Sequence, residues 1–411
     1  MSPSPNDSPR QRAGRPELVM EIGRALLSLG APAHRLEDAM EVLSSRLNLD
    51  GQFYCTPTAI IATLGRGRAR RTHMTRVHDS QMDLGKLSAI HEVIESLARD
   101  EAGPVDAIRE VRRIMDGPRT HPAWLMPIAS LLVASAVAIL LGAGPMELAL
   151  ASLLGLQTGL LGNLMGRGRA ATRLFPAVAG MLAALVAGLV AFFTPPFSLF
   201  LAIVPGLIVL MPGLGITLAA RELGTGHLVS GSAHMAGAVF SLLVVGFGVA
   251  LGTELAQLAT GPLTPGSAQT PLPEWARLAG ILAAGVGFTL LFGAPQWGFG
   301  WILLASVLAA ELGGRAAEAF NPGLGALLGS LAVGVVGNLV ARLRNVPASL
   351  IQMPGIMLLV PGSLGFGGLT TLLDQDPLGG VQIGFTVALV ATGLATGLLV
   401  ASALVPPRRA L

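Results

Sequence analysis

The sequence predicts a multi-pass α-helical membrane protein, with ten transmembrane helices as two inverted five-helix repeats and a small soluble α/β N-terminal domain. Hydrophobic residues make up 52% of the 411 residues and charged residues only 12%, whereas a soluble protein carries about 25% charged residues. Most charges lie in residues 1–119, while 120–411 consists of apolar blocks with short polar breaks. A motif with two Pro-Gly pairs occurs once in each half of the apolar part. Most of the chain is therefore expected to lie in lipid.

The first part of the chain is expected to hold a disordered tail at 1–15 and a cytoplasmic α/β domain at 16–118. The tail is polar and lacks the apolar core of a signal peptide. In the domain, apolar residues at helical spacing predict helices, and short β-branched segments predict strands between them. The expected elements are helices at 18–29, 36–47, 84–97 and 104–115, and strands at 52–55, 58–64 and 70–77.

The segment His34-Arg-Leu-Glu-Asp38 is the most conspicuous polar patch of this domain. On a helix, His34, Asp38 and Glu41 share one face, which would suit a metal or acid–base site. The alternative is a solvated or docking helix start, whose carboxylates stabilise the positive end of the helix dipole. We favour this alternative, because the chain has no GxSxG or HExxH motif and its single cysteine, Cys55, has no obvious activating partner. The sequence thus predicts no enzyme, no catalytic residue, no metal site and no cofactor.

Ten apolar segments approach the length that crosses a bilayer, about 20 residues. They occupy 125–143, 146–165, 174–193, 197–219, 228–251, 275–293, 297–312, 324–341, 349–366 and 381–405. Arginines gather in alternate loops, so the positive-inside rule places both termini in the cytoplasm and the chain in the cell inner membrane. The membrane part is expected to divide into a first repeat at 119–259, an extracytoplasmic linker at 260–274 and a second repeat at 275–411.

Two interrupted helices point to a substrate site. The fourth and ninth spans each carry two Pro-Gly pairs; proline removes a backbone donor and glycine adds freedom, so both helices should bend or unwind. The alternative is ordinary kinking, which is common in membrane helices. Because five spans is an odd number, the halves are inverted, and interrupted helices at matching positions of such repeats typically bind substrate. The predicted pocket residues are Pro205, Gly206, Pro212, Gly213, Pro354, Gly355, Pro361 and Gly362.

The two interrupted segments should leave backbone groups unpaired, which lipid cannot satisfy, so both must face the protein interior. Three polar side chains that lie on spans are predicted to supply hydrogen bonds to the substrate: Asn163, Asn338 and Gln352. Proton coupling is assigned to His234, Glu222 and Asp374, because an ionisable group is costly in lipid and histidine titrates near neutral pH. Of these, Glu222 and Asp374 lie at span ends, where a solvated charge is the default.

The chain resembles the threonine/serine exporter family from about Pro16 to Pro406. The resemblance rests on Gly30-Ala-Pro-Ala-His-Arg-Leu-Glu-Asp38, Thr56-Pro-Thr58, Thr75-Arg-Val77, both Pro-Gly motifs and Asn338-Leu-Val-Ala-Arg-Leu-Arg344. The family's usual His-Arg-Val-Glu reads His34-Arg-Leu-Glu37 here. The resemblance implies a fused ten-span chain with a cytoplasmic N-terminal domain, where other members work as a pair of five-span proteins. Related two-chain systems are associated with dicarboxylate export, so the resemblance leaves the substrate open.

The resemblance implies export of threonine and serine. The absence of a GxxxxGK[ST] loop for ATP favours secondary transport, so the expected function is proton-driven export of these amino acids, as in an antiporter. A succinate-type dicarboxylate exporter is the alternative, and it is disfavoured because the span interiors carry no Lys or Arg for a dianion. A membrane-anchored enzyme acting through 16–118 and a passive channel are further alternatives. The expected partners are the small-molecule substrate, a proton and the lipid bilayer, with a homo-oligomer left open. Nucleic acid is not expected, since the net charge is only +3.

Overall fold

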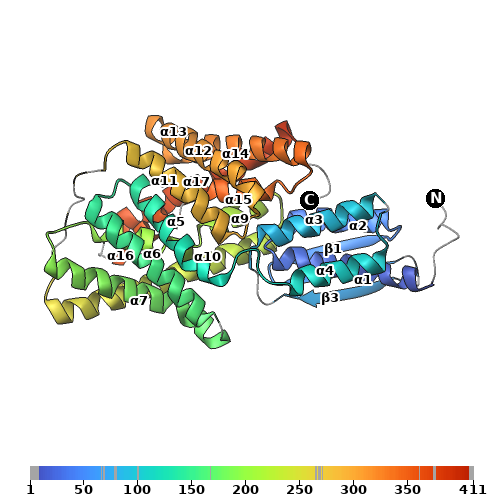
Figure 1. The fold of residues 1–411 in the computed structure, drawn as a ribbon, viewed down its shortest axis with the longest axis horizontal. Helices are drawn as coiled ribbons and strands as arrows, with labels where there is room; N and C mark the ends of the chain where they lie inside the picture. The colour runs from blue at the N-terminus through green and yellow to red at the C-terminus, as the bar shows by residue number, and fades with distance from the viewer. Residues whose placement is uncertain are drawn as a thin grey trace.

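The computed structural model shows an α/β unit at one end of a larger helical bundle (Figure 1). It describes residues 9–406 except 66, 68–69, 78–80, 100, 167, 264–265, 267–269, 271, 361 and 374–375. The α/β unit, called the N-terminal unit below, comprises residues 9–116, and the bundle comprises residues 123–404.

The N-terminal unit packs four helices with a three-stranded antiparallel sheet. Its elements are α1 (Pro9–Ser28), α2 (Ala33–Arg46), β1 (Gly51–Thr56), β2 (Ala59–Leu64), β3 (Arg71–Arg76), α3 (Leu84–Ala98) and α4 (Pro104–Asp116). The strand order is β1-β2-β3, and Ile60 of the central strand pairs with Cys55 and Thr75. Alternate residues of β2 are buried in a core that includes Leu18 and Leu26 of α1. This order of elements is the one that the sequence periodicity predicts.

Helix α1 begins earlier than expected. It starts at Pro9, so residues 9–15, expected in the disordered tail, are helical, and residues 1–8 lie outside the described residues. Proline is well tolerated in the first turn, where its missing N–H has no helical acceptor in any case. Further along the early part of α1, Arg15 Nη1 donates to Leu47 O at 3.1 Å, which connects this part of the helix to the end of α2. Composition alone does not reveal such a contact.

The described part of the bundle has eight helices long and apolar enough to cross a membrane, or nine if the bent pair α8–α9 is one span. Its elements are η2 (Ala123–Leu125), α5 (Met126–Leu140), α6 (Pro145–Met165), α7 (Arg169–Phe193), α8 (Leu199–Gly206), η3 (Ile208–Leu210), α9 (Gly213–Gly224), α10 (Leu228–Thr260), α11 (Trp275–Leu291), η4 (Gln296–Gly298), α12 (Phe299–Leu308), η5 (Ala309–Gly313), α13 (Gly314–Ala319), α14 (Pro322–Arg344), α15 (Ser349–Met357), α16 (Gly362–Leu373) and α17 (Pro377–Leu404).

Two spans differ in the structure from the lengths that the sequence predicts. The sixth, α11, is apolar but has only 17 residues, so ten spans stay a prediction. The seventh is longer than expected, because a π-helical turn, η5, joins α12 to α13 in one apolar helix of 24 residues, Gln296–Ala319.

Helices pack in matching pairs in the two halves of the bundle. The third expected span packs against the fifth in each half, as α7 with α10 and α14 with α17. The second packs against the fourth, as α6 with α8 and α12 with α15. The first spans of both halves, α5 and α11, pack against each other. Two repeats would produce this arrangement, while their inversion across a bilayer stays a prediction.

The N-terminal unit is bonded directly to the ends of bundle helices. The Leu84 N–H donates to Phe292 O at 2.8 Å, where α11 ends. The Ala33 N–H donates to Glu222 Oε1 at 3.0 Å, near the end of α9. The segment that contains His34 is therefore a docking surface, which is one of the two interpretations favoured above.

Candidate functional site

The fourth span is interrupted where its Pro-Gly pairs predict. Helix α8 ends at Gly206, one turn of η3 follows, and α9 begins at Gly213. The two parts of the span meet at 55°. Pro205 and Pro212 lack the N–H that an unbroken helix needs at these positions. The predicted bend in this span is confirmed, and we call this segment the first break.

The ninth span also loses its helical structure between its Pro-Gly pairs, but it runs on as one span without a bend like that of the fourth. Helix α15 contains Pro354 and ends at Met357, and α16 begins at Gly362. Pro361 lies outside the described residues. Gly355 lies against Val333 of α14 and Ala305 of α12, and a Cβ there would come within 2.8 Å of both side chains. Its lack of a side chain allows close helix packing. We call residues 358–360 and Gly362 of this span the second break.

The two breaks lie against each other. A Cβ built on Gly213 would overlap Val360 Cγ1 and lie 3.0 Å from the Gly362 nitrogen. A Cβ on Gly362 would lie 3.0 Å from Met211 Cβ and 3.6 Å from Gly213 Cα. Glycine at both positions lets the backbones approach, so segments about 150 residues apart in the chain meet inside the bundle.

Two backbone carbonyls at the first break accept hydrogen bonds from threonine hydroxyls, so these two are not left unpaired as expected. Thr158 Oγ1 of α6 donates to Gly206 O at 3.0 Å. Thr217 Oγ1 donates to Gly213 O at 3.1 Å, one turn along α9. A hydroxyl can reach a carbonyl that a broken helix no longer uses, so irregular backbone is tolerated at membrane depth. These bonds hold the first break in place.

A cavity of about 330 Å³, called the break cavity, lies beside the two breaks. Its walls include Ile208 of the first break, residues 357–360 and Ser363 at the second, and Ala309, Ala310 and Gly313 of the π-helical turn η5. Its size is in the range of small-molecule sites, about 300–1,000 Å³. π-Helical turns occur frequently at functional sites. The cavity is mainly apolar and has room for a small amino acid.

Arg277 is a charged residue of this cavity that the sequence reading missed. Its Nε donates to Glu311 Oε1 at 3.0 Å and its Nη2 to Ala310 O at 3.0 Å, while Glu311 also binds Arg315 at 2.9 Å. The expectation that span interiors carry no Arg is thus wrong near the start of α11. The partners lie far apart in the chain, so their spacing holds no signal. The π-helical turn directs the Ala310 carbonyl to the guanidinium.

Neither the predicted polar side chains nor the described residues of the Pro-Gly pairs line the break cavity, whose walls are formed by residues next to those pairs. Gln352 Nε2 donates to Asn338 Oδ1 at 2.9 Å, and both residues are buried. Gln352 lines a smaller cavity between α15 and the N-terminal unit. Asn163, near the C-terminal end of α6, donates to Ala123 O at 2.7 Å. The structure therefore brings Asn338 and Gln352 together and leaves Asn163 apart from them.

Two of the three proton-coupling candidates form a pair. His234 Nδ1 and Glu222 Oε2 lie 2.6 Å apart. Glu222 is fully buried, because the N-terminal unit covers this end of α9 and Ala33 binds its other oxygen. The expectation that Glu222, at the end of a span, is solvated is therefore wrong. Asp374 lies outside the described residues.

A second carboxylate–imidazole pair connects the N-terminal unit to α10. His227 Nε2 lies 3.1 Å from Glu37 Oε2, and the Cys55 N–H donates to Glu37 Oε1 at 2.7 Å. Ser230 Oγ donates to Cys55 O at 3.0 Å. Burial and the Glu37 carboxylate raise the pKa of the Cys55 thiol to about 12, so the thiol stays protonated. Glu37 thus serves in docking.

His34 lies next to these pairs with its ring centre 6.0 Å from that of His227. Both of its ring nitrogens are buried and make no hydrogen bond within the described residues. Burial, and then the positive charges of Arg221 and Arg35, lower the His34 pKa to about 2. His34 is therefore a neutral packing residue, and the metal or acid–base interpretation of its patch finds no support in this geometry.

Comparison with known proteins identifies the family. Two family models, both described as threonine/serine exporter, match residues 17–256 and 284–404. Similar curated proteins are named pheromone-regulated membrane protein 10; those of Kluyveromyces lactis, Candida glabrata and Saccharomyces cerevisiae are 24%, 25% and 26% identical. The matches cover 96% of this chain and 44%, 53% and 54% of those proteins, so the chain spans about half their length. No solved structure matches. Because the first family model alone matches more than half of the residues, the chain belongs to the threonine/serine exporter family.

Proposed function

We propose that the protein is a secondary active exporter of threonine and serine across the cytoplasmic membrane, driven by the proton gradient. Family membership supports transport rather than catalysis. The observation that carries the proposal is the meeting of two helix breaks beside a cavity of about 330 Å³. Interrupted helices at matching positions are typical of the substrate site of transporters that alternate between two faces.

The helix ends at the breaks suit a zwitterion. Helices α9 and α16 begin at Gly213 and Gly362, so two positive helix ends meet where these glycines touch. Helices α8 and α15 end at Gly206 and Met357, which brings negative helix ends to the same region. The substrate carboxylate would lie against the first pair and its ammonium group against the second. Ser363 on the cavity wall offers a hydroxyl for the substrate side chain.

A dicarboxylate is the second candidate substrate, because Arg277 lines the break cavity. The Arg277 guanidinium is already bound to Glu311 and to a backbone carbonyl, so it neutralises the protein's own carboxylate. A dianion would also face Glu318 on the same wall. These charges favour a zwitterion over a dianion.

Proton coupling is proposed for Glu222 and His234. A carboxylate and an imidazole 2.6 Å apart can share one proton, and histidine changes charge near neutral pH. Glu222 also binds Ala33, so its charge acts on the docking of the N-terminal unit. Asp374 stays a candidate from the sequence alone.

The proposed orientation places the N-terminal unit in the cytoplasm. The bundle ends that contact it are the start of α10 and α15 and the end of α9 and α11. The arginine distribution assigns these same ends to the inside. This agreement supports the proposed orientation and the linker at 260–274 on the opposite side.

Counterflow in proteoliposomes tests the proposal. Vesicles loaded with unlabelled threonine, serine or succinate are given the same compound in labelled form outside. An exporter accumulates label transiently with threonine and serine, whereas a channel only equilibrates it and an anchored enzyme does neither. Accumulation of succinate alone would replace the amino acids by dicarboxylates as the substrate class.

A matched pair of variants connects transport to the breaks. Gly213→Leu places a side chain between the breaks, whereas Gly237→Leu adds one on the exposed face of α10, where no heavy atom lies within 4 Å. We expect Gly213→Leu to abolish counterflow with the protein still inserted, and Gly237→Leu to retain it. Equal activity in both variants would exclude the breaks as the site.

A further inference from the structure

A small, partly open cavity lies between the N-terminal unit and the end of the bundle that contacts it, separate from the break cavity. Its volume is about 50 Å³, and it is lined by residues of α2, α3, α9 and α15 together with the loops before α2, α3 and α15. We call it the junction cavity. One water needs about 10–15 Å³ by this measure, so the cavity has room for a molecule of a few heavy atoms.

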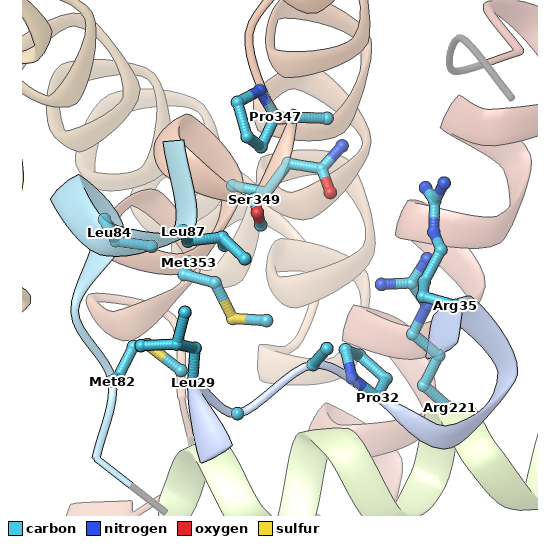
Figure 2. Close-up of a pocket in the computed structure, with 14 residues that line it drawn as sticks. Leu29, Pro32, Arg35, Met82, Leu84, Leu87, Arg221, Pro347, Ser349 and Met353 are labelled. Carbon is cyan, nitrogen blue, oxygen red and sulfur yellow. The ribbon is translucent and has the colours of Figure 1, made fainter. Parts of the chain in front are cut away.

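Two arginines lie together on one side of the junction cavity, as Figure 2 shows. Arg221 comes from α9 and is only 7% exposed, and Arg35 comes from α2 and is half-buried. The charge of each guanidinium repels the other, and burial lowers the Arg35 pKa from its usual value. Asp38 and Glu222 offset part of this repulsion from a distance, but two like charges in one partly desolvated place are costly without a directly bonded counter-charge.

No carboxylate of the described residues pairs with Arg221. Its Nε is buried and has no hydrogen-bond partner there, and neither guanidinium forms an ion pair within that part of the chain. The neighbouring carboxylate, Glu222, is instead bound to His234 and to the Ala33 N–H. A buried donor without an acceptor costs free energy, and a bound ion or small molecule that accepts from Arg221 would remove this cost.

The remaining walls define the rest of the ligand. Leu84, Leu87 and Met353 lie across the cavity from the arginines, and Ser349 lies between them (Figure 2). An apolar wall facing two guanidinium groups suits a short hydrocarbon chain that ends in a carboxylate. A guanidinium binds carboxylates through two parallel hydrogen bonds, and the apolar wall has nothing to offer a free phosphate.

We propose that the junction cavity is a binding site for a small aliphatic carboxylate, held by Arg35 and Arg221, and that its occupancy binds the N-terminal unit to the bundle. Because one arginine comes from each part, the ligand joins them through its two oxygens. This inference goes beyond the proposed function, since it requires binding only and no transport step.

Calorimetric titration of the full-length protein in detergent with propionate tests the proposal. We expect one site, and binding about tenfold weaker or less in Arg35→Gln and in Arg221→Gln, because each loses a charged hydrogen-bond pair. Arg35→Lys keeps the positive charge but loses the two parallel N–H donors of the guanidinium, so its affinity for propionate should be intermediate. Arg46→Gln, on the exposed face of the same helix, is the matched control and should bind as the parent does.

Further ligands identify the chemistry and its source. Phosphate and butylamine should bind at least tenfold more weakly than propionate; equal binding of phosphate would overturn the aliphatic carboxylate as ligand. Displacement of propionate by threonine would identify the transported substrate as the natural ligand, whereas no displacement would identify a separate carboxylate. If Arg221→Gln does not fold, Arg35→Gln and Arg35→Lys still decide the matter. Absence of propionate binding, or unchanged affinity in both Arg35 variants, would refute the proposal.

Discussion

The contact between the two breaks leads to a graded prediction for three glycine-to-alanine variants. A methyl group at Gly213 overlaps Val360 and presses on the Gly362 backbone, which cannot move aside as a flexible side chain can. At Gly362 the nearest atom, Met211 Cβ, is 3.0 Å away, so a shift of a few tenths of an ångström suffices. At Gly237 no heavy atom lies within 4 Å.

These distances predict that the substitutions change the free energy of unfolding in opposite directions. Overpacking a well-packed interior costs about 1–3 kcal/mol, so Gly213→Ala should lower the free energy of unfolding by about that amount. Gly237 lies in the middle of α10, where alanine is favoured over glycine by roughly 0.5–1 kcal/mol, so Gly237→Ala should raise it. Gly362→Ala should lie between the two.

Thermal melting of the purified variants in detergent, together with threonine counterflow, tests this order. We expect melting temperatures to rise from Gly213→Ala through Gly362→Ala to Gly237→Ala. Counterflow should fall about tenfold in Gly213→Ala, equivalent to about 1.4 kcal/mol, and stay unchanged in Gly237→Ala. A Gly213→Ala protein that melts no lower than the parent and exchanges threonine at the parental rate would refute the contact between the breaks.

Three further variants test the junction and the first break. Glu222→Gln keeps an oxygen for the Ala33 N–H but loses the charge facing His234, so export should lose its dependence on a pH gradient while counterflow persists; Glu254→Gln, exposed on α10, should change neither. His34, whose pKa is lowered to about 2 by burial, is neutral when docked and protonates near 6.5 when released, so docking is strongest above that pH and weakens on acidification. At about pH 5 the free energy of docking should be weaker by roughly 1–2 kcal/mol after allowance for the partial exposure of His34. This weakening should vanish in His34→Gln. A rate of proteolysis at the junction that does not depend on pH in the parent protein would contradict this. Thr158→Val removes the donor to Gly206 O and should lower the free energy of unfolding by about 1–3 kcal/mol in a melting experiment; no loss would show that the carbonyl finds another donor.

Local features of the chain predicted the broken helices well. Both interruptions fall between the two Pro-Gly pairs of a span, whereas a single proline such as Pro176 lies inside an unbroken helix, so the doubled pair is the signal that predicts a break. The order of elements in the N-terminal unit follows from apolar periodicity, which is also a local property. The length of the seventh span was predicted less well, because a π-helical turn at Ala309–Gly313 carries Glu311, whose charge is bound by Arg277 of α11, inside an apolar helix.

The candidate site was predicted in part. Glu222 and His234 were singled out for their charge in an apolar context, and the structure joins them in one pair. Asn163 was chosen for its position on a span, yet its partner is a carbonyl at the bundle end. Arg277 was missed, since its partner Glu311 lies on another helix and no spacing rule connects the two.

The sequence by itself determined that most of the chain is a membrane protein and where two of its helices break. These properties depend on the hydropathy of each segment and on the local geometry of proline and glycine, which act over a few residues. Only the tertiary structure decided that Gly213 meets Gly362 and that the N-terminal unit buries Glu222 and Arg221. Such contacts depend on how helices far apart in the chain pack, because a charge at a span end is solvated until another part of the protein covers it.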